Sequence, residues 1–294
     1  MHTRTLGNDT VGTHQVGAVG IGCMTMDQEG RAPRDQLLAT VRAAVDAGVT
    51  LFDTADAYGP GKLGAGANGE NERLLASLLD EAGVREHALV ATKAGHVRTD
   101  PDGGWDTDSS AEHLRHAVDA SIERLGVEHI DLWQHHRPDP DTPYEEVLQT
   151  LKAIHDSGKV RMIGLSNADP EQIKTAHAVL GSALVSVQNQ FSPKFRSSAR
   201  EIEVCADLGI AFLPWSPLGG LNDAKELAEK HPAFARVAEE HEVSAQQIAI
   251  AWELAQADVV IPIPGAKRPE SITDSAAAAD LQLTDEQLAA LDAD

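Results

Sequence analysis

Side chains that could carry out proton chemistry recur along the chain at Asp53, Tyr58, Lys93 and the pair His135–His136. A tyrosine is a poor acid at neutral pH because its ordinary pKa is about 10. A nearby lysine ammonium stabilises the phenolate and lowers that pKa, and an aspartate keeps the lysine charged and aimed. A histidine beside the tyrosine can orient a carbonyl oxygen or relay a proton. Together these groups predict a general acid, with Tyr58 as the proton donor.

Such an acid suits protonation of the alkoxide that forms when hydride reaches a carbonyl carbon. Hydride transfer needs a cofactor. Asn167 and Gln188 are suitable partners for an amide on that cofactor, and Trp215 can stack on a flat ring. These residues therefore predict reduction of an aldehyde or ketone to an alcohol.

A regular framework has to position these side chains, and the apolar pattern predicts one. Short apolar runs, typical of parallel strands covered by helices, alternate with helical segments without a linker or low-complexity break. We expect strands at 18–23, 51–53, 88–93, 130–135, 160–165, 184–187, 210–213 and 259–261. We expect helices at 35–47, 70–82, 111–125, 144–157, 170–180, 199–208, 224–230, 232–241, 244–257, 269–279 and 284–292.

Eight such units in 294 residues favour a (β/α)8 TIM barrel over a doubly wound sheet. We predict a single α/β barrel domain over residues 1–294, with a short N-terminal β-hairpin at 3–7 and 12–16. The active site of such barrels lies at the carboxyl ends of the strands. Six consecutive expected strand ends carry polar or titratable residues, which are Asp53 with Tyr58, Lys93, His135–His136, Ser166–Asn167, Gln188 and Trp215–Ser216. That is unusual for a purely structural rim.

Longer segments around these positions resemble the aldo-keto reductases over nearly the whole chain. They are 20–24 (GIGCM), 53–59 (DTADAYG), 91–93 (ATK), 131–137 (DLWQHHR), 164–167 (GLSN), 188–192 (QNQFS), 215–219 (WSPLG) and 263–270 (IPGAKRPE). The resemblance implies a reversible, NADPH-dependent reduction of a small-molecule carbonyl, with hydride from the nicotinamide. It also implies a catalytic tetrad of Asp53, Tyr58, Lys93 and His136, with Tyr58 as the general acid.

The two adjacent histidines have different expected roles. Neighbouring residues of a strand face opposite ways, and strand parity alone leaves open which histidine faces the site. In the family pattern an aspartate, a leucine, an aromatic residue, a glutamine, a leucine, a histidine and an arginine follow one another. In that register His136 is the catalytic histidine and His135 takes the place of the leucine. We therefore expect His135 to be structural, packed between strand and helix.

The resemblance also implies a site for NADP(H), with NAD(H) as the weaker alternative. Ser166, Asn167 and Gln188 look like a clamp for the nicotinamide carboxamide, and Trp215 stands where the family usually stacks a tyrosine. The expected cofactor-binding residues are Gly22, Cys23, Met24, Asp53, Ser166, Asn167, Gln188, Trp215, Ser216, Pro217, Leu218, Gly219, Pro264, Gly265, Lys267, Arg268 and Asp274.

The preference for NADP rests on Lys267 and Arg268, two adjacent basic residues beside an expected helix start, where a phosphate is favoured. They look like a clamp for the 2′-phosphate. The family commonly has an arginine three residues later and then a glutamate–asparagine pair at the adenine, where this chain has Ser271 and Asp274–Ser275. Asp274 can still accept a hydrogen bond from the adenine amino group.

The expected substrate contacts are Met24, Tyr58, Trp105 and His136. The loop 94–110, which contains Arg98 and Trp105, is the best candidate for choosing the substrate. The chain lacks a longer glycine-rich belt at 221–223 and a long segment after its last expected helix, so we expect an open site that admits a fairly large substrate. Keto-sugars, small aldehydes, pyridoxal-like aldehydes and quinoid or polyketide carbonyls all remain open.

The composition argues against other classes of protein. Lys and Arg total 24 and Asp and Glu 46, and the net charge of −22 argues against binding to nucleic acids or anionic membranes.

The sequence also shows no sign of a membrane span or a signal peptide. No apolar run approaches the roughly 20 residues of a membrane span, and the first residues lack a signal-peptide core. Two cysteines are too few for a disulfide framework or a zinc site, and we expect no metal. We expect a cytoplasmic monomer or small homo-oligomer.

Two other hypotheses compete with the carbonyl reductase. One is a redox-sensing regulatory subunit of the same fold, which would bind NADPH and act through a partner. The intact set of four tetrad residues favours the enzyme over this sensor. The other is a metal-dependent barrel hydrolase, which the absence of clustered metal ligands at the first expected strand disfavours.

Overall fold

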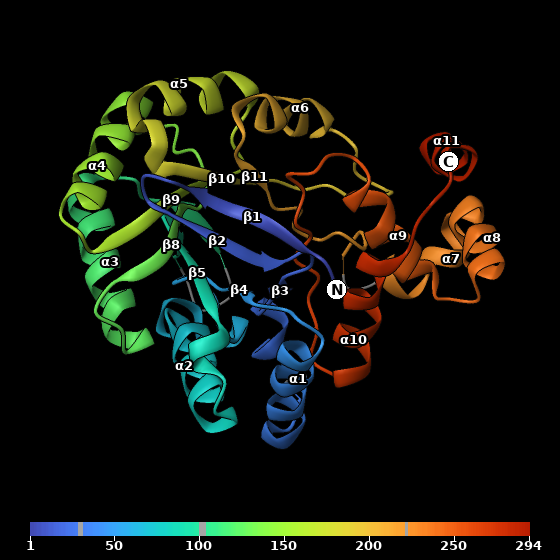
Figure 1. Cartoon of the computed structure of the whole chain (residues 1–294). Coiled ribbons are helices and arrows are strands. Elements are labelled where there is room, and N and C mark those ends of the chain that lie inside the picture. The colour runs from blue at the N-terminus through green and yellow to red at the C-terminus, as the bar shows by residue number, and fades with distance from the viewer. Residues whose placement is uncertain (29–31, 100–103, 221–222) are drawn as a thin grey trace.

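The chain forms a curled parallel sheet surrounded by helices, as the alternating pattern predicts (Figure 1). The computed structural model describes residues 1–28, 32–99, 104–220 and 223–294. Seven strands pair in the order β11-β10-β9-β8-β5-β4-β3. The strands are β1 Thr3–Asn8, β2 Gly12–Gly17, β3 Ile21–Gly22, β4 Leu51–Asp53, β5 Leu89–Ala94, β6 His96–Arg98, β7 Trp105–Thr107, β8 Ile130–His135, β9 Val160–Ser166, β10 Leu184–Gln188 and β11 Ala211–Phe212.

The barrel closes through residues 259–265, which lie between β11 and β3. Phe212 forms a parallel bridge with Val260, and Gly22 forms one with Gly265. The predicted strands at 259–261 and 18–23 were therefore too long. The structure has only β3, Ile21–Gly22, in the second range and an isolated bridge at Val260 in the first. Proline has no backbone N–H to donate, and Pro262 and Pro264 contribute only their carbonyls, which accept from Gly20 and Gly22. The (β/α)8 prediction is confirmed, with an irregular eighth strand.

The helices that cover the sheet begin and end close to their expected positions. The predicted helices at 70–82, 111–125, 170–180, 199–208 and 232–241 match the structure at both ends. Local signals explain these ends: α5 starts with a capping box at Asp169, and α2 ends at Gly83 in the left-handed conformation. The helices are α1 Arg34–Asp46, α2 Glu70–Ala82, α3 Ala111–Leu125, α4 Tyr144–Asp156, α5 Pro170–Leu180, α6 Ala199–Leu208, α7 Leu227–Lys230, α8 Pro232–His241, α9 Ala245–Leu254, α10 Pro269–Ala277 and α11 Asp285–Asp292.

The predicted N-terminal hairpin, β1 and β2, covers the end of the barrel where the strands begin. Leu6 and Val16 are buried in one cluster with Leu51 and Leu89, the first residues of β4 and β5. The hairpin crosses the sheet in Figure 1. The described hairpin therefore leaves the opposite end, where the strands finish, available for a site inside the barrel.

A second hairpin lies where the sequence pattern predicted a plain loop at 94–110. Strands β6 and β7 pair antiparallel, with His96 opposite Thr107 and Arg98 opposite Trp105. Residues 100–103, which come between the two strands in the sequence, lie outside the described residues. Three-residue strands leave too little pattern to predict, which is why the hairpin was missed.

Both cysteines are buried thiols, as expected. Among the described residues, no helix combines the length and the apolar character needed to cross a membrane.

Candidate active site

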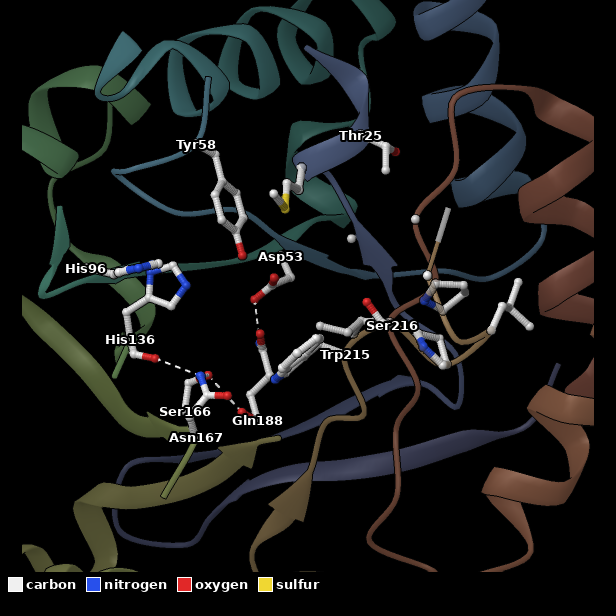
Figure 2. A pocket seen from close by; sticks show the side chains of 18 of the residues that line it. Thr25, Asp53, Tyr58, His96, His136, Ser166, Asn167, Gln188, Trp215 and Ser216 are labelled. Atoms are coloured by element: carbon white, nitrogen blue, oxygen red, sulfur yellow. Dashed lines mark hydrogen bonds between the residues drawn. The ribbon is translucent and has the colours of Figure 1, made fainter. Parts of the chain in front are cut away.

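A cavity of about 650 Å³ opens at the carboxyl ends of the strands (Figure 2). This is within the usual range for small-molecule sites. Its lining comes from nearly every strand end of the barrel. The residues are Gly22, Met24, Thr25, Asp53, Tyr58, His96, Trp105, His136, Arg137, Ser166, Asn167, Gln188, Trp215, Ser216, Pro217, Leu218, Gly220, Ala224, Ile263, Pro264 and Gly265.

Asp53, Lys93 and Tyr58 meet at the floor of the cavity. The Lys93 ammonium donates to Asp53 Oδ2 at 2.6 Å, to the Thr54 carbonyl at 2.8 Å and to the Tyr58 hydroxyl at 3.3 Å. Lys93 is completely buried and Asp53 is 3% exposed. A buried lysine needs such partners to stay charged, so the structure explains how a cation can face the Tyr58 hydroxyl.

Two glutamine side chains complete the shell around Asp53. Gln134 and Gln188 both donate to Asp53 Oδ1, at 3.0 and 2.8 Å, while Oδ2 receives Lys93. No role was predicted for Gln134 from the sequence. Alternate residues of a strand point to the same face, so its position two residues before His136 was the signal that could have placed it inside the barrel.

The protonation of Tyr58 differs from the expectation. Burial raises the pKa of Tyr58 above its ordinary value, and the Lys93 charge opposes this without reversing it. The prediction of a lowered tyrosine pKa was therefore wrong for this structure, because it counted the charge and not the burial. Burial also lowers the pKa of Lys93, but Asp53 and Tyr58 outweigh it and the net shift is upward. Tyr58 is thus a neutral phenol beside a lysine cation at neutral pH.

His136 lies immediately after β8 and faces the cavity. Its ring is edge-on to Tyr58, with centroids 5.6 Å apart. Its backbone N–H donates to the Ala94 carbonyl, while its Nδ1 is buried without a hydrogen-bond partner among the described residues. Burial and the nearby Lys93 charge hold the pKa of His136 well below its ordinary value. The ring is therefore neutral at pH 7 and can donate or accept a hydrogen bond.

His135 points away from the cavity, as expected of a structural residue. It is 1% exposed, and its Nε2 lies 2.8 Å from Ser109 Oγ. Burial lowers its pKa to about 4, so this ring is also neutral.

Ser166, Asn167 and Gln188 form a connected set at the side of the cavity. Ser166 Oγ donates to the Gln188 carbonyl at 2.7 Å. Asn167 Nδ2 donates at 3.0 Å to Ser166 Oγ and to the His136 carbonyl (Figure 2). The Asn167 backbone is left-handed, with φ of 58°, a conformation that asparagine tolerates better than most residues. Trp215 lines the neighbouring wall, and its buried Nε1 has no partner in the described structure.

Five of the expected cofactor residues do not line this cavity: Cys23, Gly219, Lys267, Arg268 and Asp274. The Cys23 side chain is fully buried in the apolar core. Arg268 donates to Ser271 Oγ at 3.3 Å, beside the start of α10. Asp274 Oδ2 accepts a hydrogen bond from Ser244 Oγ at 2.6 Å, and Ser244 is the residue that caps α9. That carboxylate therefore ties two helices together in this structure. Of residues 221–223, where a longer glycine-rich belt is expected to be missing, 221 and 222 lie outside the described residues.

All four expected substrate contacts, Met24, Tyr58, Trp105 and His136, line the cavity. His96, which the sequence reasoning missed, stacks on Trp105 with centroids 4.4 Å apart and lies edge-on to His136 at 5.1 Å. Figure 2 shows His96 and His136 on the same side of the Tyr58 hydroxyl. The other unpredicted lining residues are Thr25, Arg137, Gly220, Ala224 and Ile263. Within the described ranges, no cluster of three His, Cys, Asp or Glu side chains could hold a metal ion.

Comparison with known families and proteins gives consistent results. The model of the aldo/keto reductase family matches residues 18–293. An oxidoreductase of Schizosaccharomyces pombe is 34% identical, covering 97% of this chain and 89% of that protein. A 6-dehydroglucose reductase of Novosphingobium aromaticivorans is 36% identical, covering 90% and 86%. A probable aldo-keto reductase of Glycine max is 33% identical, covering 93% and 84%.

Solved structures give the same fold. A thermostable aldo-keto reductase in complex with the inhibitor epalrestat superposes with a TM-score of 0.82 and 24% identity, covering 100% of this chain and 99% of that chain. An aldo/keto reductase of Klebsiella pneumoniae, solved with NADP and acetate, has a TM-score of 0.78 and 24% identity, covering 95% and 91%.

Proposed function

The chain belongs to the aldo/keto reductase family, and we propose that it reduces an aldehyde or ketone to an alcohol with hydride from NADPH, reversibly. The observation that carries this proposal is the contact of the Lys93 ammonium with both Asp53 Oδ2 and the Tyr58 hydroxyl, at 2.6 and 3.3 Å. It supports a phenol that can release a proton into the cavity because a buried cation stabilises the phenolate left behind.

The donor set and the walls of the cavity fit a nicotinamide cofactor. Ser166, Asn167 and Gln188 offer hydroxyl and amide groups for the carboxamide, and the Trp215 ring offers a stacking face. Ser216, Pro217, Leu218 and Gly219, together with Gly22, Cys23, Met24, Pro264 and Gly265 on the other side, are proposed to hold the rest of the cofactor. When bound, this group supplies hydride to the carbonyl carbon.

We propose NADP over NAD because of Lys267 and Arg268. A 2′-phosphate needs a cation, and in a chain of net charge −22 this adjacent pair lies beside the start of α10. The helix N-terminus adds backbone N–H donors for the same anion. The NADP in the Klebsiella pneumoniae structure supports a nicotinamide cofactor in this fold.

The residues of the site have separate proposed roles. Tyr58 donates its proton to the carbonyl oxygen as the alkoxide forms. Lys93 stabilises the resulting phenolate, and Asp53 keeps Lys93 charged. His136, neutral because its pKa is well below its ordinary value, is proposed to hydrogen-bond to the carbonyl oxygen and aim it at Tyr58. Met24 and Trp105 are proposed to form the substrate walls.

The decisive experiment is a panel of carbonyl compounds assayed with NADPH and with NADH. The panel should include sugar-derived aldehydes, because one relative is a 6-dehydroglucose reductase, as well as small, aromatic and quinoid carbonyls. We expect multiple turnovers with NADPH on at least one compound, and less with NADH. Oxidation of bound NADPH once, without steady-state turnover on any compound, would instead support the redox-sensing subunit.

A further inference from the structure

One arginine outside the expected tetrad holds the backbone on both sides of Tyr58. Arg98 Nε donates to the Ala57 carbonyl and Arg98 Nη2 donates to the Gly59 carbonyl, each at 3.0 Å. The arginine is 8% exposed. Its planar guanidinium presents several donors in a fixed arrangement, so a single side chain spans the residue that carries the proposed acid.

These two bonds complete the fixing of three consecutive peptide groups. The Tyr58 carbonyl itself accepts from the Asn71 N–H at 3.3 Å. The peptide carbonyls of residues 57, 58 and 59 are thus all engaged, two of them by Arg98. The backbone around Tyr58 sets the direction of its Cα–Cβ bond, and that direction sets the place of its hydroxyl. By fixing this backbone, Arg98 therefore helps to set the 3.3 Å distance between the Lys93 ammonium and the Tyr58 hydroxyl.

Arg98 also joins this loop to the wall of the cavity. It belongs to β6, and its guanidinium carbon lies 4.2 Å from the centroid of the Trp105 ring on the paired strand β7. Trp105 in turn stacks on His96, which lies beside His136. The hairpin β6–β7 is attached to the loop that carries the acid through a buried, charged side chain that is otherwise unexplained by the chemistry.

We propose that Arg98 is a positioning residue that holds the Tyr58 hydroxyl in line with Lys93 and the substrate carbonyl. The inference rests on the proposed function, since it concerns the step in which Tyr58 donates its proton. Arg98 does not touch the reacting atoms. Its removal should therefore impair proton donation and leave cofactor binding intact.

The test compares Arg98→Met and Arg98→Lys with a matched control, Arg4→Met. Arg4 also donates to two backbone carbonyls, those of Leu254 and Ala257, but it lies on β1 at the opposite end of the barrel. The measurements are kcat per NADPH-binding site, the Kd for NADPH, the melting temperature and the solvent deuterium isotope effect on kcat. Counting active sites by NADPH binding removes any contribution from misfolded protein.

We expect Arg98→Met to lower kcat by about tenfold to a hundredfold, the scale expected for a misplaced catalytic group. Its solvent isotope effect should exceed that of the wild type, because proton donation becomes more rate-limiting, and its Kd for NADPH should stay within about threefold. Arg98→Lys should recover part of kcat. Arg4→Met should lower only the melting temperature.

Two results would overturn the inference. The first is an unchanged kcat per site in Arg98→Met. The second is a lower kcat with an unchanged isotope effect, which would mean that Arg98 only supports the fold. The two failures are distinguishable. If the wild-type protein turns over no carbonyl at all, the proposed function fails, and the inference fails with it. If the wild type is active and Arg98→Met gives either of the two results above, only the inference fails.

Discussion

The two ends of the proposed cofactor site are built in different ways. At the inner end, Asp53 and Lys93 are buried, and the oxygens of Asp53 accept from Lys93, Gln134 and Gln188. At the outer end, Arg268 is exposed and Lys267 is partly exposed beside the start of α10. Water screens charges at the outer end far more than at the inner one. Changes inside should therefore act on the chemical step, and changes outside should act on affinity.

The largest effect is expected from removing the proposed acid. Tyr58→Phe keeps the ring and removes only the hydroxyl that lies 3.3 Å from the Lys93 ammonium. Positioned acids contribute about 10²- to 10⁴-fold to a rate, so carbonyl reduction should fall on that scale. NADPH affinity, measured by fluorescence titration, should stay within about threefold. Activity that survives this substitution would assign the proton to another group.

The next largest effect is expected from Asp53→Asn, which keeps the shape of the side chain and removes its charge. Lys93 would be left fully buried without its anionic partner. Breaking a buried ion pair from one side costs about 3–5 kcal/mol, and a misaimed lysine should lower kcat by about a hundredfold. Urea unfolding and steady-state kinetics measure the two quantities.

The matched control for this substitution is Asp156→Asn. The Asp156 carboxylate pairs with Lys152 on the surface of α4, where both side chains are about half exposed. A surface pair of this kind is worth less than about 1 kcal/mol. An equal loss of stability in the two variants would mean that burial does not distinguish the inner pair.

At the outer end we expect a smaller effect that depends on the cofactor. Lys267→Ala combined with Arg268→Ala should raise the KM for NADPH by about tenfold to a hundredfold, since a bond to a charged group is worth about 1.5–3 kcal/mol. The KM for NADH and the kcat should change little. High salt should shrink the difference between variant and wild type. Equal effects on the KM for NADPH and the KM for NADH would mean that Lys267 and Arg268 do not bind the 2′-phosphate.

The same contrast separates what the sequence could predict from what it could not. Expected strands end at Asp53 and Lys93, and Tyr58 and His136 come soon after strand ends. The carboxyl ends of parallel strands meet at one end of a barrel. Their meeting could therefore be predicted from the alternation of strands and helices. The direction of the Tyr58 pKa shift could not, because it depends on how much water the fold removes from the phenol relative to the charge of Lys93.

Contacts made by short or irregular segments were also beyond prediction. The hairpin of β6 and β7 consists of two three-residue strands, too short for a period of two to be recognised. Arg98, Trp105 and His96 are close to one another only because this hairpin forms. The role of Asp274 in capping α9 through Ser244 likewise depends on how α9 packs against α10.

The smallest effect at the inner end is expected from pH itself. The pKa of His136 is well below its ordinary 6.5, and those of Tyr58 and Lys93 are above their ordinary 10.0 and 10.5. The imidazole is then neutral, and the phenol and ammonium keep their protons, throughout the range between. We therefore expect kcat/KM for the carbonyl substrate, at saturating NADPH, to be nearly flat from about pH 7 to 9.

The reverse reaction sharpens this expectation, because alcohol oxidation needs Tyr58 as the phenolate. A raised tyrosine pKa makes the phenolate scarce at neutral pH, so the oxidation rate should rise steadily with pH over the interval in which the reduction rate is flat.

At the outer end the titrating group is the 2′-phosphate of the cofactor. A phosphate monoester gains a proton at about pH 6, and the affinity for NADPH should weaken below that pH. An inflection of the reduction rate near pH 7 at saturating NADPH would contradict the expected flat profile. It would mean that a group at the inner end titrates near pH 7, against the shifted pKa values of His136, Tyr58 and Lys93.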